Sequence, residues 1–157
     1  MSISLRLGSA LLACALSLAS AGPGFAVDNM VSKDAPDLTK VRALIKAKDY
    51  KTALSELYVL SDSVQHADVY NLMGFSLRKS GDYKTAATYY AKALDFNPEH
   101  KGALEYQGEL YVETGDLPKA RENLVKLVKL CPTGCEERED LEKAIAAAPA
   151  GSGAKTN

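Results

Sequence analysis

The 157-residue sequence lacks tryptophan, and its histidines number two, His66 and His100. Neither histidine shares a motif with a serine and an aspartate, and the sequence contains no glycine-rich phosphate-binding loop. We therefore expect neither enzymatic activity nor a cofactor. Both histidines lie at junctions between periodic apolar segments, where we expect solvated side chains and not general bases or metal ligands.

The sequence also lacks an excess of basic residues, because 19 Lys and Arg stand against 20 Asp and Glu. Nucleic-acid-binding proteins generally carry clustered excess positive charge, so a nucleic-acid partner is not expected. The length is that of one ordinary domain, and the 46% of hydrophobic residues is enough for a core.

The first 26 residues differ in composition from the rest of the chain. Arg6 is their one charged residue, Leu7–Ala19 is almost wholly apolar or small, and Ala19–Ala21 has the form of an A-x-A cleavage site. These features are typical of a signal peptide, cleaved after Ala21 or Ala26, followed by a flexible leader over residues 27–33. The apolar run is too short for a membrane span of about 20 residues. We therefore expect export to the bacterial periplasm.

Cys14 suggests an alternative cellular location for the protein. Leu11-Leu12-Ala13-Cys14 resembles the lipobox of bacterial lipoproteins, which would leave the protein anchored in a membrane through Cys14. Against this, the apolar run continues past Cys14 to the site at Ala19–Ala21. A cysteine within an apolar signal segment is therefore the preferred interpretation.

The rest of the chain contains a repeat that is clearest over residues 67–98. Its marked positions are Tyr70, Met73, Gly74, Leu77, Gly81, Asp82, Tyr83, Ala86, Tyr90, Ala93 and Pro98. Leu104, Gly108, Gly115, Asp116, Ala120 and Pro132 repeat the pattern 34 residues later, with the polar Gln107 at a position that is otherwise apolar. An earlier, less regular copy has Lys48 in place of the turn glycine.

The repeat resembles the tetratricopeptide repeat, a helix-turn-helix of about 34 residues. The resemblance implies an all-α fold, a short right-handed solenoid of three units at residues 34–66, 67–100 and 101–134. Residues 135–148, apolar along one stripe and acidic at the start, are expected to form a capping helix. Residues 149–157 are expected to be a disordered tail.

Small residues and turn residues have defined roles in this pattern. Gly74 and Gly108 are expected to allow close approach of the second helix of each unit, opposite the small Ala86 and Ala120. Gly81 and Gly115 are expected to adopt positive φ at the end of the first helix, and Asp82 and Asp116 to cap the next.

The resemblance also implies a binding surface, because in tetratricopeptide proteins the first helices line a concave groove that takes a segment of a partner protein. By position, the groove residues are Arg42, Lys46, Asn71, Phe75, Arg78, Lys79, Glu105, Glu109 and Glu113. This groove would be basic at one end and acidic at the other. Alternatively, the three glutamates form a solvated helix face without a ligand.

Cys131 and Cys135 are the strongest chemical signal in the sequence. A structural disulfide that joins the last helix of the third unit to the capping helix is the preferred interpretation. A redox-active pair is a second possibility, although three residues separate the cysteines where oxidoreductase motifs have two. A metal site is a third, and it would need two further ligands.

The sequence thus favours a non-enzymatic interaction module that binds another protein or peptide. The alternatives are a thiol redox protein or sensor that uses Cys131 and Cys135, and a structural subunit of an envelope assembly. No metal or other cofactor is predicted.

Overall fold

The structure is a computed structural model that describes residues 35–149. These residues form seven α-helices and no strand: α1 Thr39–Lys46, α2 Tyr50–Ser61, α3 Ala67–Lys79, α4 Tyr83–Phe96, α5 Lys101–Glu113, α6 Leu117–Leu130 and α7 Glu136–Ala146. The predicted signal peptide, its cleavage sites and the leader lie outside the described residues, as does the predicted tail after Pro149. Within residues 35–149, no helix has the length and apolar character to cross a membrane.

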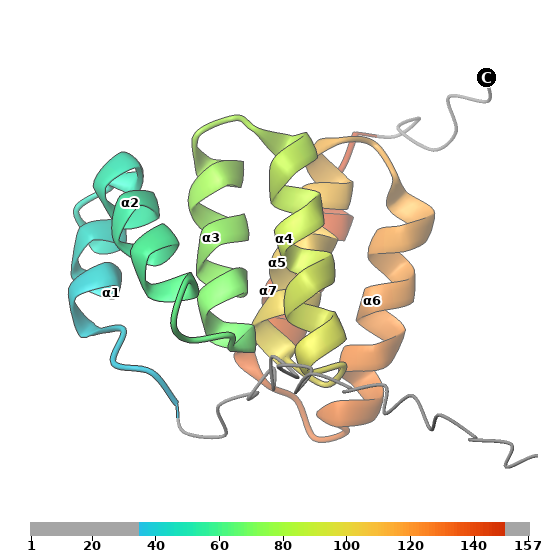
Figure 1. The fold of residues 1–157 in the computed structure, drawn as a ribbon. Coiled ribbons are helices and arrows are strands. Elements are labelled where there is room, and N and C mark those ends of the chain that lie inside the picture. Colours follow the sequence, from blue (N-terminus) through green and yellow to red (C-terminus); the bar gives the residue numbers. More distant parts are fainter. Residues whose placement is uncertain (1–34, 150–157) are drawn as a thin grey trace, which may run out of the picture.

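The helices follow one another as three antiparallel pairs and a single last helix (Figure 1). Each helix packs on the one before it, and α3 also contacts α5, as α5 contacts α7. The all-α solenoid predicted from the sequence is therefore confirmed. Because α7 contacts α5 and α6 as α5 contacts α3 and α4, α7 takes the place of the first helix of a fourth unit.

The turns between paired helices have the geometry expected from their sequences. Gly81 and Gly115 have φ of +87° and +82°. The Asp82 and Asp116 carboxylates accept bonds from the N–H groups of Thr85 and Lys119, at 3.1 and 3.3 Å. These contacts satisfy N–H groups that have no partner within the helix.

Lys48 occupies the same left-handed position in the first unit, with φ of +62°. A side chain in this conformation costs about 1 kcal/mol or more relative to glycine, whereas glycine adds entropy to the unfolded chain. We expect Lys48→Gly to raise the free energy of unfolding by about 0.5 kcal/mol, measured by urea denaturation. The control Ala43→Gly, inside α1, should lower it by about 1 kcal/mol. Equal effects of the two changes would contradict this explanation.

The histidines are not the solvated junction residues that we expected from the sequence. His66 Nδ1 accepts from Asp68 N–H at 3.2 Å, and His100 Nδ1 accepts from Ala103 N–H at 3.0 Å, so each caps the helix that follows it. His100 Nε2 also lies 2.8 Å from Asp68 Oδ1, which ties the start of α5 to the start of α3. Both side chains are partly buried, and each stabilises the start of a helix.

Gly74 and Gly108 make room for different neighbours: Gly74 for α4 of its own unit, and Gly108 for α7. Ala86 and Ala120 are fully buried, but the atoms nearest to a Cβ placed on Gly74 belong to the Tyr90 ring, at 2.7 Å. A Cβ on Gly108 would meet Leu141 of α7 at 2.6 Å. Gly74 therefore makes room for an aromatic ring of its own unit, and Gly108 makes room for the last helix.

Gln107, polar at an otherwise apolar position, has a buried partner that the sequence pattern did not reveal. Asn123 of α6 donates to Gln107 Oε1 at 3.0 Å and to the Leu104 carbonyl oxygen at 3.1 Å. Both side chains are at most 7% exposed. Buried polar groups are tolerated when they bond to each other, so this pair replaces an apolar contact between α5 and α6.

Candidate functional site

The first helix of each unit, together with α7, contributes side chains to one face of the solenoid, which we call the inner face. It comprises α1, α3, α5 and α7, whereas α2, α4 and α6 form the opposite row (Figure 1). The hollows described below are lined by residues of these four helices and the segments that flank them. The inner face is therefore the candidate binding surface.

An aromatic cup lies between α1, α3 and α5. It is a hollow of about 210 Å³ lined by Arg42, Ile45, Lys46, Leu72, Phe75 and Tyr106. The Phe75 and Tyr106 rings pack with their centroids 4.9 Å apart, and the Tyr50 ring contacts Phe75 from its edge. The Arg42 and Lys46 side chains are exposed at the rim. The cup thus combines an apolar floor with a basic edge.

Arg78 lies next to the cup but is not part of an open basic surface. It is 3% exposed, and its guanidinium bonds Glu109 and, at 2.8 Å, Glu113. Although burial alone would lower its pKa, Tyr90 and the two glutamates raise it. The guanidinium also lies 5.7 and 5.8 Å from the Phe75 and Tyr106 centroids. Arg78 is therefore held by the two glutamates and contacts both rings of the cup.

A second hollow, the acidic pocket, adjoins the cup. It has a volume of about 290 Å³ and is lined by Arg42, Asp68, Asn71, Leu72, His100, Gly102, Glu105, Tyr106, Glu136, Glu137 and Asp140. Glu105 is 7% exposed. Burial, followed by the neighbouring Glu109, Asp140 and Glu137, raises the pKa of Glu105 to about 8, against the opposing effect of Arg78. Five carboxyl groups thus surround one small space.

The structure places all nine predicted groove residues around the three hollows of the inner face. Lys46 and Phe75 line the cup, Asn71 and Glu105 line the acidic pocket, and Arg42 lines both. Lys79, Glu109 and Glu113 line a third hollow of about 380 Å³ with Arg78. Their role in binding stays a prediction. Glu105 is buried and Glu109 half-buried, so the three glutamates do not form the solvated face considered as an alternative.

The sequence reasoning missed the inner-face residues Ile45, Leu72 and Tyr106 and the α7 acids Glu136, Glu137 and Asp140. The repeat spacing in the sequence could have identified some of these residues. Asp140 follows Tyr106 by the repeat length, as Tyr106 follows Leu72. Treating α7 as the start of a fourth unit, and not as an outer cap, would have placed its acids on the inner face.

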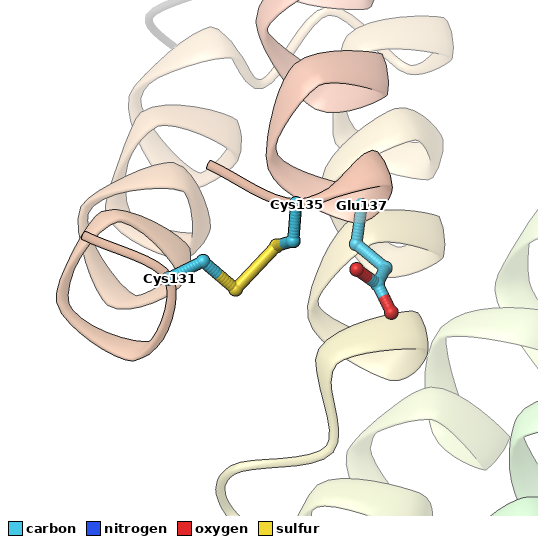
Figure 2. A group of neighbouring side chains, drawn as sticks. All are labelled: Cys131, Cys135 and Glu137. Carbon is cyan, nitrogen blue, oxygen red and sulfur yellow. A yellow bond between two sulfur atoms is a disulfide. The ribbon is translucent and has the colours of Figure 1, made fainter. Parts of the chain in front are cut away.

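Cys131 and Cys135 lie where α6 ends and α7 begins. Cys131 is the C-cap of α6 and Cys135 the N-cap of α7. Their Cα atoms are 5.8 Å apart, within the usual range for a disulfide, and their Sγ atoms lie at bonding distance (Figure 2). The geometry therefore fits the predicted link between the third unit and α7.

Glu137 lies beside the two cysteines, as Figure 2 shows. One ligand atom from each of the three residues falls within 4.8 Å of the others. A structural zinc ion requires four ligands, and residues 35–149 bring no fourth His, Cys, Asp or Glu into this group. We assign no metal to it.

Paired helices that stack in one row and present their first helices on one face define a helical repeat protein. A family profile described as tetratricopeptide repeat matches residues 67–100, the unit formed by α3 and α4. Residues 67–100 are therefore a tetratricopeptide repeat. Members of this family typically act as non-enzymatic modules that bind other proteins or peptides. The match favours this class over the thiol redox and envelope-subunit alternatives.

The chain is also similar to named proteins. It is 29% identical over 90 residues to the "Uncharacterized protein ycf37" of Pyropia yezoensis, covering 57% of this chain and 48% of that protein. It is 32% identical over 81 residues to the ycf37 protein of Guillardia theta, covering 52% and 45%. A "Sol locus transcriptional repressor" of Clostridium acetobutylicum is 37% identical over 62 residues, covering 40% and 20%. The matched segment thus spans about half the length of the ycf37 relatives.

Proposed function

We propose that this chain is an interaction module of the bacterial periplasm and binds a segment of another protein along its inner face. The observation that supports this most directly is the aromatic cup, where half-buried Phe75 and Tyr106 form the floor beneath the exposed Arg42 and Lys46. Apolar and aromatic hollows bordered by a few charged groups are typical of binding sites. Repeat solenoids commonly bind on the face formed by successive first helices.

The shape of the inner face supports an extended segment over a small molecule. The cup and the acidic pocket share Arg42, Leu72 and Tyr106, so they are continuous. A further hollow over α3, α5 and α7 extends the same face toward Pro149. A peptide with side chains at successive positions would occupy such a row of adjoining hollows.

Affinity capture with two charge-matched variants tests the proposal. The inner-face variant Arg42→Glu, Lys46→Glu alters exposed side chains at the rim of the cup. The control variant Lys126→Glu, Lys129→Glu makes the same charge change on α6. The bait is the chain without residues 1–26, and proteins captured from periplasmic extract are quantified by mass spectrometry.

We expect the captured amount of at least one protein to differ about tenfold between the inner-face variant and the unchanged chain, which corresponds to about 1.4 kcal/mol. Its capture by the control variant should be unchanged. If every captured protein responds equally to the two variants, the inner face is not the binding surface. Arg78 is left unaltered in this test because its substitution would disturb the core.

Export and the disulfide form the second part of the proposal, because disulfides persist in oxidising compartments such as the periplasm. In protein isolated from the cell envelope, we expect an N-terminus at Gly22 or Val27 and a Cys131–Cys135 pair that does not react with N-ethylmaleimide. The same chain made in the cytoplasm without residues 1–26 serves as the reduced control. A lipid-modified Cys14 or free thiols in the envelope-derived protein would contradict this part. Intact-protein mass spectrometry distinguishes these outcomes.

A further inference from the structure

The acidic pocket contains a buried acceptor without a donor. Asn71 is 6% exposed, and its Oδ1 has no hydrogen-bond partner within residues 35–149. The side chain lines the pocket from α3. An unpaired buried acceptor destabilises the free protein, so a ligand that donates a hydrogen bond to Asn71 Oδ1 would remove this cost.

Glu105 faces the same pocket from α5 and is also without a partner. No hydrogen bond or ion pair engages its carboxyl group in the described part of the chain, and the residue is 7% exposed. Two other acids of the pocket already have partners: Asp68 binds His100, and Asp140 binds Lys143 at 2.8 Å. Glu105 and Asn71 therefore offer acceptors at the buried side of the pocket.

Acidic side chains predominate in the pocket. Asp68, Glu105, Glu136, Glu137 and Asp140 contribute acids, against the single guanidinium of Arg42 and the imidazole of His100. Acceptors and acids predominate, while Leu72 and Tyr106 provide an apolar wall toward the cup. This lining is complementary to a long side chain with an apolar stem and a cationic end.

We infer that the acidic pocket receives a lysine or arginine side chain of the partner segment, with an apolar residue of the same segment in the adjoining aromatic cup. The charged groups of lysine and arginine carry hydrogen-bond donors and no acceptors. They can therefore donate to the acceptors Asn71 Oδ1 and Glu105. Their methylene stems pack against apolar and aromatic surface while the charged end reaches the acids. The inference rests on the proposed function, since it names the chemistry of the segment bound there.

The protonation of Glu105 gives this binding a specific signature. With a pKa raised to about 8, the free protein holds Glu105 mostly protonated at pH 7. The groups that act on it are Glu109 on its own helix, Glu137 and Asp140 from α7, and Arg78 from α3. A cation beside the carboxyl group favours its charged form, so binding should release up to about one proton at pH 7 and strengthen toward pH 9.

The test begins with a random twelve-residue peptide display library selected on the chain without residues 1–26. We expect Lys or Arg at one fixed position beside a large apolar residue. A selected peptide is then synthesised, and its affinity is measured by titration calorimetry at pH 7 in phosphate and in Tris, which differ in ionisation enthalpy. The two buffers should give different apparent enthalpies that report proton release.

Two Glu→Gln variants test whether peptide affinity and proton release depend on Glu105. Glu105→Gln keeps the volume of the side chain and removes its negative charge, and we expect it to weaken the peptide about tenfold and to abolish proton release. Glu122→Gln on the exposed surface of α6 is the matched control and should change neither. Replacing the basic residue of the peptide by norleucine should cause a similar loss with the unchanged protein.

The possible results separate the inference from the proposed function. Selected peptides that depend on Arg42 and Lys46 but show no basic preference would overturn the inference and leave inner-face binding intact. Peptides that bind equally well to the inner-face variant would overturn both. Magnesium and calcium chloride are titrated alone. If either ion binds more tightly than the selected peptide and is lost with Glu105→Gln, the pocket is a metal site and the inference is wrong.

Discussion

Replacing Arg78 with alanine is expected to lower the free energy of unfolding by about 3 kcal/mol, because removing one partner of a buried ion pair leaves the other charges uncompensated. Arg78 is 3% exposed and joins α3 to α5 through Glu109 and Glu113. Its loss also removes contacts with the Phe75 and Tyr106 rings. The estimate lies at the lower end of the usual range since the two glutamates are partly exposed and water can solvate them.

Lys79→Ala is the matched control for this experiment. Lys79 is the next residue, carries the same charge and lies 5.4 Å from the Phe75 centroid, but its side chain is exposed. Its removal should change stability by about 0.5 kcal/mol or less. Urea denaturation followed by circular dichroism measures both variants. Similar losses for Arg78→Ala and Lys79→Ala would show that the buried ion pair does not hold α3 and α5 together.

The stability of the chain is expected to fall by about 2 kcal/mol between pH 5 and pH 9 because of Glu105. Its pKa is raised from 4.5 to about 8 in the folded chain, mainly by burial. Between these two values the folded state holds a proton that the unfolded state has released. Stability from this group is therefore present below pH 4.5 and is lost as the pH rises toward 8. The magnitude is reduced from the full conversion since Glu105 borders an open pocket.

The variant Glu105→Gln separates this contribution from all others. It should match the unchanged chain at pH 5 and exceed its unfolding free energy by about 2 kcal/mol at pH 9. Glu122→Gln, which is exposed on α6, should retain the pH dependence of the unchanged chain. Urea midpoints measured at one-unit intervals give the comparison. Parallel pH curves for Glu105→Gln and the unchanged chain would mean that Glu105 is ionised at neutral pH in the folded protein.

The parts of the fold that depend on neighbours in sequence were predictable. A turn glycine followed by aspartate determines where one helix ends and the next begins, and Gly81–Asp82 and Gly115–Asp116 behave as expected. The repeat spacing also showed that Lys48 stands where the other two units have the turn glycine. The helix ends at these turns depend on backbone conformation and capping within a few residues, so they can be predicted from the local sequence.

The candidate site depends on contacts between units, which the repeat pattern does not specify. Arg78 appeared to be a free groove cation because its partners lie 31 and 35 residues further along the chain. Glu105 appeared to be one of three equivalent surface acids, and its burial becomes evident only when α5 and α7 are placed together. Position in a repeat identifies which face a residue occupies. It does not identify which charges on that face are already paired.

Part of the acidic pocket is formed by α7, a helix that is synthesised late. α7 supplies Glu136, Glu137 and Asp140, and it docks through Leu141 onto Gly108. A ribosome makes α7 after the six other helices of residues 35–149, so the residues of the aromatic cup are synthesised before the three acids of α7. A product of premature termination before residue 136 would retain the basic rim of the cup without these three acids. If the inner face binds as proposed, this product would prefer different partner segments from those preferred by the chain that contains α7.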